Sequence, residues 1–307
     1  MRFPTTVFEF QQQFPDEDAC WRWLRRVRWP KGFRCPRCAH RESSWLAPRQ
    51  LDQCRACRYQ ASLTAGTVLH RTRVPLRVWL LAIFFLSQHK QGISALQLQR
   101  DAGIGSYKTA WSLLHKLRAA LRPRPGQLLR GLVEADETYL GAPHEKNRRG
   151  GRAHGRKALV GAVVERQRRR GRLRLGVLES HTFERDLGPF VRGAIEGRHT
   201  TVRTDGLNSY RQLATAGVAH ERVVQGPDRS RGPLLFPWSH AVFSNLKSWL
   251  RGTFHGVSHK HLPSYLDEFA YRFNHRADDA IGVILARNAL RSRPFPYGSI
   301  VAAESGG

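Results

Sequence analysis

Apolar residues recur at helical spacing in the first part of the chain. Phe14, Cys20 and Leu24 predict a short helical lead-in over residues 1–30, with Cys20 in the core. Pro75 then opens a strongly apolar helix, PLRVWLLAIFFLSQHK, since proline is well tolerated in the first turn of a helix. These two patterns predict helices on either side of a segment that is rich in cysteine and arginine.

Two shorter helices follow, and a serine suited to capping precedes each. Ser94 and Ser106 flank the glycine-containing turn AGIGS, and this order after a long apolar helix is typical of a helix-turn-helix. An ordinary three-helix bundle with no role in DNA binding fits the same pattern. The second helix is expected to bury Ala110, Leu113, Leu114 and Leu117 and to point Lys108, His115 and Arg118 outward.

The pattern changes to strands from about residue 128. Three strand-like segments come in sequence, helices then alternate with two further strands, and two helices are expected at about 240–251 and 258–276. This order predicts an α/β fold in which helices pack on a mixed sheet. A basic, glycine-rich loop is expected at 142–157, and residues 280–307 are expected to form a loosely ordered tail. The strand segments are LLRGLVEADETYL, ALVGAVVER, GRLRLGVLES, HTTVRTDG and HERVVQG.

Two CxxC motifs lie between the helical segments. Cys35 and Cys38 form one, and Cys54 and Cys57 form the other after an interval of fifteen residues. Each CxxC turn directs two sulfurs at one point, so the four thiolates predict a tetrahedral Zn²⁺ site in a small basic zinc ribbon over residues 31–69. Fortuitous cysteine pairs, or two disulfides, are the alternatives. A redox role would need a thioredoxin-like βαβ context, and none surrounds either motif.

The charge balance indicates a polyanionic partner. The 307 residues include 51 Lys+Arg against 24 Asp+Glu, a formal net charge of +27. Such a field attracts nucleic acid, and arginine suits bidentate phosphate contacts. A membrane surface is a competing polyanion, but the longest apolar run, Val78–Leu86, has nine residues and is too short to span a bilayer. The N-terminus lacks the features of a secretory signal, so a cytoplasmic, DNA-binding protein is expected.

Acidic residues are scarce, so those within apolar strands stand out. Alternation places Glu134, Asp136 and Thr138 on one face of a strand, and Asp205 ends another strand. A carboxylate in a strand costs desolvation free energy, which a bound divalent cation would offset. Two such groups on neighbouring strands would hold Mg²⁺ or Mn²⁺ for phosphodiester chemistry. The alternatives are a plain turn at Asp205-Gly206 and a solvated strand face at Asp136.

A later helix, HAVFSNLKSWLRGTF, carries a polar stripe. Its members are His240, Ser244, Lys247 and Arg251, at i, i+4, i+7 and i+11. Lys247 lies two turns from His240 and is suitably placed to hold a phosphate. A basic helix face that merely touches solvent is the alternative. The opposite, apolar side comprises Val242, Leu246, Trp249, Leu250 and Thr253.

The chain resembles the bacterial insertion-sequence transposases of the ISXO-like class. The resemblance covers about residues 14–276, in the order zinc ribbon, helix-turn-helix, VEADETYLG, TDGLNSY and HAVFSNLKSWLRGTFHGVSHKHLPSYLDEFAYRFNHR. It implies a DDE-type enzyme with an RNase H-like catalytic domain. The expected division is a lead-in and zinc ribbon at 1–69, a helix-turn-helix domain at 70–126, the catalytic domain at 127–279 and a tail at 280–307.

The resemblance also assigns roles to individual residues. Asp136 and Asp205 correspond to the metal-binding aspartates of the family, and the third acidic position falls on His240. The family's following lysine corresponds to Lys247. Most relatives carry glutamate where this chain has His240, and histidine suits Mg²⁺ less well than a carboxylate does. The alternatives for the third ligand are Asn245 and, after it, Glu134.

The implied function is DNA transposition. The chain would bind terminal inverted repeats and target DNA as a homo-oligomer, with the basic loop at 142–157 against phosphates. Asp136, Asp205 and His240 would hold two Mg²⁺ or Mn²⁺ ions that activate water and then the 3′-hydroxyl, while Lys247 steadies the strand. The main alternative is a non-enzymatic DNA-binding protein, either a catalytically decayed transposase or a zinc-ribbon regulator. An RNase H-like nuclease acting on RNA–DNA hybrids is a third reading.

Overall fold

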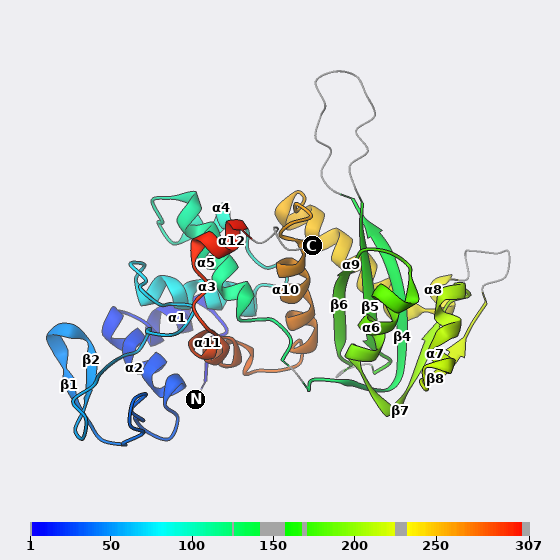
Figure 1. The fold of residues 1–307 in the computed structure, drawn as a ribbon. Helices are drawn as coiled ribbons and strands as arrows, with labels where there is room; N and C mark the ends of the chain where they lie inside the picture. Colours follow the sequence, from blue (N-terminus) through cyan, green and yellow to red (C-terminus); the bar gives the residue numbers. More distant parts are fainter. Residues whose placement is uncertain (1, 125, 142–156, 168–170, 225–231, 303–307) are drawn as a thin grey trace. The chain divides into compact units, whose positions relative to one another are not determined.

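The chain divides into two compact units. One comprises Met1–Leu121 and Asp278–Gly307, and the other comprises Arg122–Ala277 (Figure 1). None of the helices in the described part of the chain has the length and apolar character needed to cross a membrane. The predicted basic loop at 142–157 lies outside the described residues except for Lys157. The computed structural model describes residues 2–124, 126–141, 157–167, 171–224 and 232–302.

The first unit begins with the predicted helical lead-in. Helices α1 (Val7–Gln13) and α2 (Glu17–Arg28) each start at a residue whose side chain accepts a backbone N–H from the third helical residue. These caps are Thr6 and Asp16. Cys20 is fully buried, as the sequence predicted.

Three further helices lie where the sequence placed them. They are α3 (Leu76–Gln88), α4 (Ala95–Asp101) and α5 (Tyr107–Ala119). Ser94 caps α4, because its hydroxyl accepts a backbone N–H at 3.1 Å. Ser106 occupies the corresponding position before α5, but its side chain makes no capping hydrogen bond.

Residues 280–302 contain two helices, which corrects the expectation of a loose tail. Helices α11 (Ile281–Arg291) and α12 (Tyr297–Ala302) belong to the first unit, although they follow the second unit in the chain. Helix α11 packs against α2 and α3. The ring of Phe3 lies so close to Gly282 that a Cβ there would be 2.1 Å from Cδ1 of that ring. The buried side of α11 includes Ile281, Leu285 and Ala289.

The outward face predicted for α5 is wrong at two positions. His115 and Arg118 are each 1% exposed, so the accessible end of the helix is its N-terminus, with Tyr107 and Lys108. Helices α3, α4 and α12 all contact α5, and Tyr297 of α12 places its ring centroid 4.1 Å from Nζ of Lys108. Contact with three neighbouring helices leaves little of the surface of α5 for solvent, and polar side chains are buried with the apolar stripe.

The cysteine-rich segment forms a three-stranded antiparallel sheet in the order β1-β2-β3. Asp52 of this sheet is 1% exposed and receives two hydrogen bonds, of 3.0 and 2.8 Å, from the guanidinium of Arg25 in α2. This bidentate pair holds the ribbon against the lead-in. The elements are β1 (Ser43–Leu46), the 3₁₀ turn η1 (Ala47–Arg49), β2 (Leu51–Cys54) and β3 (Gln60–Ser62).

The second unit is built on a five-stranded mixed sheet with the order β6-β5-β4-β7-β8. β4 pairs with β5 antiparallel and with β7 parallel, so β4 is the central strand. The α/β fold, with the mixed sheet and flanking helices expected of an RNase H-like domain, is confirmed. The strands are β4 (Leu129–Leu140), β5 (Ala158–Glu165), β6 (Leu173–Leu178), β7 (Ile195–Thr204) and β8 (Ala219–Arg222).

Helices cover both faces of this sheet. Val160 and Ala162 of β5 pack in one core with α9 and α10, whereas Leu159 and Val163 pack in a second core with α6 and α7. All eight residues of β5 are therefore buried, as expected for a strand covered on both sides. The remaining elements are the π-helical turn η2 (Phe183–Leu187), α6 (Gly188–Ala194), the 3₁₀ turn η3 (Asn208–Arg211), α7 (Gln212–Thr215), α8 (Gly232–Leu235), α9 (Pro237–Phe254) and α10 (Leu262–Asn274).

Candidate active site and metal centres

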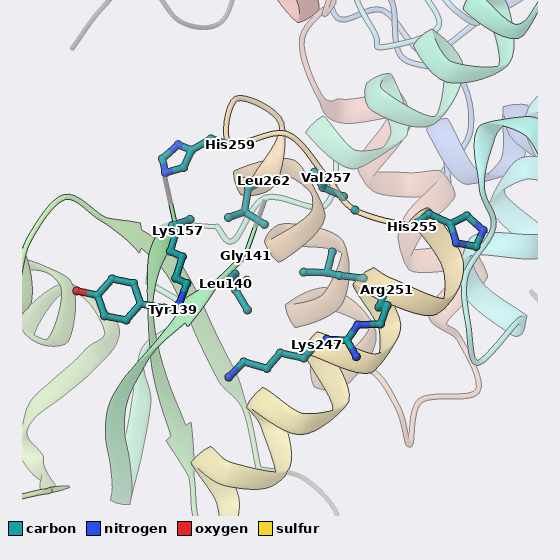
Figure 2. Close-up of a pocket in the computed structure, with 13 residues that line it drawn as sticks. Tyr139, Leu140, Gly141, Lys157, Lys247, Arg251, His255, Val257, His259 and Leu262 are labelled. Carbon is teal, nitrogen blue, oxygen red and sulfur yellow. The ribbon is translucent and has the colours of Figure 1, made fainter. Parts of the chain in front are cut away.

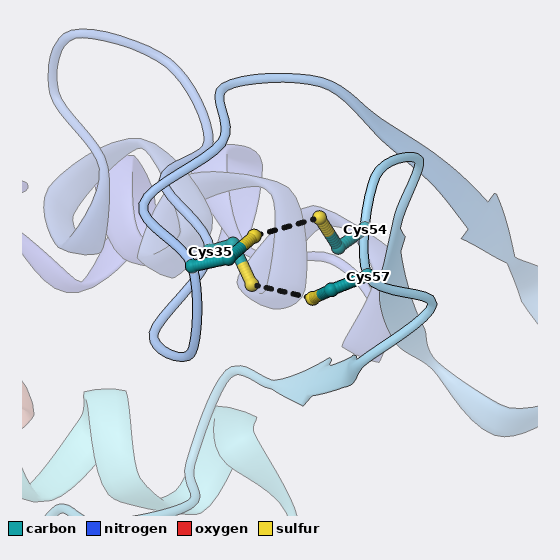
Figure 3. Close-up of side chains that lie close together, drawn as sticks. Cys35, Cys54 and Cys57 are labelled. Carbon is teal, nitrogen blue, oxygen red and sulfur yellow. Dashed lines mark hydrogen bonds between the residues drawn. The ribbon is translucent and has the colours of Figure 1, made fainter.

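The four predicted zinc ligands come together in the ribbon. The Sγ atoms of Cys35, Cys38, Cys54 and Cys57 all lie within 4.8 Å of one another. The Cys35–Cys57 and Cys38–Cys54 sulfur pairs are each 3.6 Å apart (Figure 3). A tetrahedral site with Zn–S bonds of about 2.3 Å has sulfur–sulfur edges of about 3.8 Å. The cluster therefore fits zinc, and since all four cysteines are free, the disulfide alternative is wrong.

The two cysteine knuckles have the same backbone geometry. The N–H of Ala39 donates to the carbonyl of Cys35 at 2.9 Å, and the N–H of Arg58 donates to that of Cys54 at 3.0 Å. Ala39 and Arg58 both adopt the left-handed conformation, with φ of 62° and 58°. Burial raises the pKa of Cys35, but backbone N–H groups of the same turn, including that of Cys38, outweigh it and lower the pKa to about 6. The thiolate of Cys35, which is the form that binds metal, is thus favoured. The backbone N–H of His40 lowers the pKa of Cys38, but hydrogen bonds with the other three cysteines together with burial outweigh it and raise that pKa to about 12.

The second site begins with two aspartates on neighbouring parallel strands. Glu134 of β4 pairs with Arg203 of β7, and extending this register by two residues, just past the end of β7, places Asp136 next to Asp205, whose charge acts on it. Adjacent strands lie about 4.8 Å apart. Burial raises the pKa of Asp136, hydrogen bonds lower it, and the negative charge of Asp205 raises it again, so that the pKa lies above its ordinary value. The two carboxylates therefore repel each other across the end of the sheet.

The face of β4 predicted from alternation is confirmed. Oδ2 of Asp136 accepts a hydrogen bond from the hydroxyl of Ser239 at 3.0 Å, and Nζ of Lys247 donates to the hydroxyl of Thr138 at 2.8 Å. Glu134 also contacts α9, through the backbone of Ser239. All three polar residues of this face therefore point at α9, the helix that carries His240.

Glu134 attaches the N-terminus of α9 to the sheet. This side chain is fully buried, and its Oε2 accepts the backbone N–H groups of Trp238 at 3.0 Å and Ser239 at 2.9 Å. Helix α9 has no side-chain cap of its own, so Glu134 supplies one from a different element. Its other oxygen lies 3.3 Å from Nε of Arg166. Oε1 makes no hydrogen bond to the described residues, but a cation bound there would face the guanidinium of Arg166, so Glu134 is poorly placed to be a metal ligand.

His240 and Asn245 lie on different sides of α9. His240 and Lys247 share the polar stripe, while Asn245 lies about 140° around the helix axis from His240. The charge of His240 acts on Asp136 and lowers the pKa of that carboxyl. This geometry favours His240 over Asn245 as the third member of the site.

The ligand atoms of Asp136, Asp205 and His240 do not all lie within 4.8 Å of one another. Within the described parts of the chain, the four cysteines are the only group of three or more His, Cys, Asp or Glu residues whose ligand atoms lie within 4.8 Å. Asp205 also serves as a turn residue, because its Oδ1 accepts the N–H of Leu207 at 2.9 Å. Carboxylate oxygens have further lone pairs, so this contact is compatible with metal binding. The donor set of two carboxylates that repel each other, with an imidazole nearby, fits a divalent cation with hard ligands.

Alternation and spacing missed a polar network on the opposite face of β4. Oε2 of Glu137 accepts a hydrogen bond from the hydroxyl of Tyr210 at 2.5 Å, and Nδ1 of His181 lies 3.3 Å from Oε1. The pKa of Glu137 is raised to about 7, chiefly by burial; the hydrogen bond from Tyr210 opposes this rise, and the charges of Asp136 and Asp205 contribute to it. Glu137 stands next to Asp136 in the sequence, but nothing there indicates that distant residues would enclose it. Ser239 was missed for the same reason.

Comparisons with known proteins find transposase families over both units of the chain. Residues 128–274 match the family described as ISXO2-like transposase domain, and residues 15–60 match the family described as transposase zinc-ribbon domain. The chain is 28% identical over 286 residues to an "uncharacterized protein in transposable element ISH50" of Halobacterium salinarum, covering 85% of this chain and 93% of that protein.

One solved structure is also similar to the chain. It is the simian T-cell lymphotropic virus intasome in complex with PP2A regulatory subunit B56 gamma. The similarity has a TM-score of 0.31 at 14% identity and covers 57% of this chain and 67% of that one. A TM-score this low supports no conclusion about fold or function.

Proposed function

We propose that this chain, which belongs to the insertion-sequence transposases, cuts DNA at the ends of its element and joins the freed 3′-hydroxyl to a target strand. The observation that supports this most directly is the strand register, which brings Asp136 beside Asp205 under the helix that carries His240 and Lys247. A transposase match over residues 128–274 contains all four of these positions.

Each residue has a distinct task in this proposal. Asp136, Asp205 and His240 hold Mg²⁺ or Mn²⁺, which would supply Lewis-acid activation of the attacking oxygen and stabilise the leaving oxygen. Ser239 fixes the orientation of the Asp136 carboxylate through its 3.0 Å hydrogen bond. Lys247 is held at the same helix face by Thr138 and neutralises charge on the strand being cut.

The first unit would bind the ends of the element. The ribbon holds Zn²⁺ through its four cysteines and presents a basic surface to phosphates. In the helix-turn-helix reading, the exposed N-terminus of α5 would reach base edges, since that end of a recognition helix usually makes the base contacts. Pairing of two ends by a homo-oligomer is part of the same proposal.

The test is strand cleavage by the purified full chain. With Mn²⁺ and DNA that carries the inverted repeats, we expect nicking or strand transfer, and we expect Asp136→Asn to abolish it. Asp279→Asn, an exposed position with the same change of charge, is the matched control and should stay active. Equal activity in Asp136→Asn and Asp279→Asn would remove the assigned site.

A DNA-binding protein that no longer cuts is the second candidate. The observation that favours it is His240 at the position where the family usually has an acid. His240→Glu separates the two candidates. An inactive parent that gains cleavage through this change is a decayed transposase, whereas an active parent shows that the enzyme works with histidine at this position.

A further inference from the structure

A basic pocket lies on the α9 side of the sheet, beyond the carboxylate site (Figure 2). Its cavity has a volume of about 500 Å³, and none of the described residues that line it is acidic. The walls come from the end of β4, the start of β5, α9, the turn that follows α9 and the first residue of α10. Its basic and histidine side chains are Lys157, Lys247, Arg251, His255 and His259.

The pocket has a fixed shape on several sides. Leu140, Leu250 and Leu262 form part of its lining and are each less than a tenth exposed. His255 ends α9 in the left-handed conformation, with φ of 56°, and the next residue is a glycine with φ of 117°. Lys247 is held by its hydrogen bond to Thr138. Cationic groups set on low-dielectric walls concentrate a positive field, which favours an anionic ligand.

The position of the pocket relative to Asp136 indicates which anion it takes. Thr138 and Leu140 lie two and four residues beyond Asp136 on β4. With a rise of about 3.3 Å per residue, they are roughly 7 and 13 Å further along the strand. For a DNA duplex whose axis runs along β4, each strand rises about 3.4 Å per nucleotide along that axis, so this interval corresponds to about two to four nucleotides.

We propose that this pocket binds backbone phosphates of the strand being cut, about two to four nucleotides from the scissile phosphate. The inference rests on the proposed function, because that function defines the scissile position. It adds a second backbone contact on the same strand, next to the divalent-ion site and sharing Lys247 with it. The pocket would thereby fix how far the strand advances into the site before cleavage.

The experiment measures binding of DNA ends by the full chain without Mg²⁺ or Mn²⁺, so that no cutting is needed. Single neutral methylphosphonate linkages are placed in turn on both sides of the repeat terminus. The pocket variant is Lys157→Gln with Arg251→Gln, and the control is Arg192→Gln with Arg211→Gln, which removes equal charge from exposed positions elsewhere. All four side chains are exposed, and thermal unfolding checks that both variants fold.

We expect the wild-type chain to lose several-fold in affinity when a neutral linkage falls in the predicted interval. The pocket variant should bind unmodified DNA roughly tenfold more weakly, with a salt dependence lower by about two phosphate contacts. A neutral linkage in that interval should not change the affinity of the pocket variant any further. The control variant should lose affinity at the same linkages as the wild type does.

Two results would refute the proposal that the pocket binds backbone phosphates. One is a pocket variant that binds like the control, and the other is a weakened variant that still responds fully to the neutral linkages. Saturable binding of inorganic phosphate in the pocket, with DNA affinity unchanged by the variant, would replace it with a small-anion site. If the chain does not cleave DNA but its affinity still falls at the predicted methylphosphonate positions, only the proposed catalysis would be refuted.

Discussion

The zinc ribbon and the carboxylate site differ in how far apart along the chain their residues lie. The four cysteines belong to one short segment, and two identical knuckles close around one point. Asp136, in contrast, is 103 positions from Ser239, the residue that orients it. The ribbon has only a small core around Phe33 and Ala61, whereas β4 lies between two large cores. In the ribbon, bound zinc would stabilise the fold, whereas in the second unit the fold would build the site for the proposed divalent cation.

Removing a ribbon ligand gives the largest effect that this contrast predicts. Cys54→Ser should release zinc and unfold the segment around β1, β2 and β3, because structural zinc contributes on the order of 10 kcal/mol to such small domains. The sheet of the second unit should keep its protection against hydrogen exchange. Metal analysis and segment-resolved hydrogen exchange measure both outcomes.

Cys20→Ala provides the control for this prediction, since Cys20 is buried but is not part of the cluster. It should retain its zinc. The contrast fails if the ribbon of Cys54→Ser stays protected, or if the second unit unfolds together with it.

Replacement of Glu134 should have the second-largest effect, because Glu134 attaches α9 to the sheet that carries the carboxylate site. Glu134→Ala leaves the N–H groups of Trp238 and Ser239, and the guanidinium of Arg166, without their buried partner. We expect the free energy of unfolding to fall by about 3–5 kcal/mol, with the loss of protection concentrated in α9. DNA cleavage should fall as well, because α9 carries His240.

Glu134→Gln retains an acceptor oxygen and should show a smaller loss of both stability and activity. Protection of the ribbon should be the same in both variants. An α9 that exchanges at the wild-type rate in Glu134→Ala would refute its role as the helix cap.

Glu137 predicts a pH dependence that the ribbon does not share. Burial raises its pKa to about 7 from an ordinary value of 4.5, so the folded chain without a divalent cation keeps a proton that the unfolded chain has released. The free energy of unfolding should therefore decrease as the pH rises from about 4.5 to about 7, by up to about 3 kcal/mol. Urea unfolding across this range, with zinc retained and Mg²⁺ withheld, measures the decrease.

Glu137→Gln should remove that part of the decrease, because glutamine can still accept the hydrogen bond from Tyr210 but does not titrate. Glu184→Gln, at an exposed position, should leave it unchanged. Identical pH profiles for wild type and Glu137→Gln would show that this carboxyl does not hold the proton.

Lys247 gives the smallest expected effect and tests function without affecting the fold. Its side chain is exposed, so Lys247→Ala should change stability by less than about 0.5 kcal/mol. The rate of strand cleavage should fall roughly 10- to 100-fold, or about 1.4–3 kcal/mol of transition-state stabilisation. Ser248→Ala on the same helix is the control, and equal rates for the two variants would exclude Lys247 from the site.

The sequence predicted those parts of the molecule that depend on local patterns. CxxC spacing predicted the ribbon, and alternation along VEADETYL predicted that Glu134, Asp136 and Thr138 share a face. The task of Glu134 was not predictable, because its partners are backbone N–H groups more than a hundred positions away. Burial of His115 in α5 and the docking of α11 were missed likewise, since each depends on helices that meet only in the folded unit.

The interruption of the first unit by the second has a consequence for synthesis. Helix α11, which lies against α2 and α3, leaves the ribosome only after the whole of Arg122–Ala277 has been made. The helical core around Phe3 thus stays incomplete while the five-stranded sheet is already able to form. A premature stop just after Ala277 would therefore damage the N-terminal half of the polypeptide and spare the segment made immediately before the break.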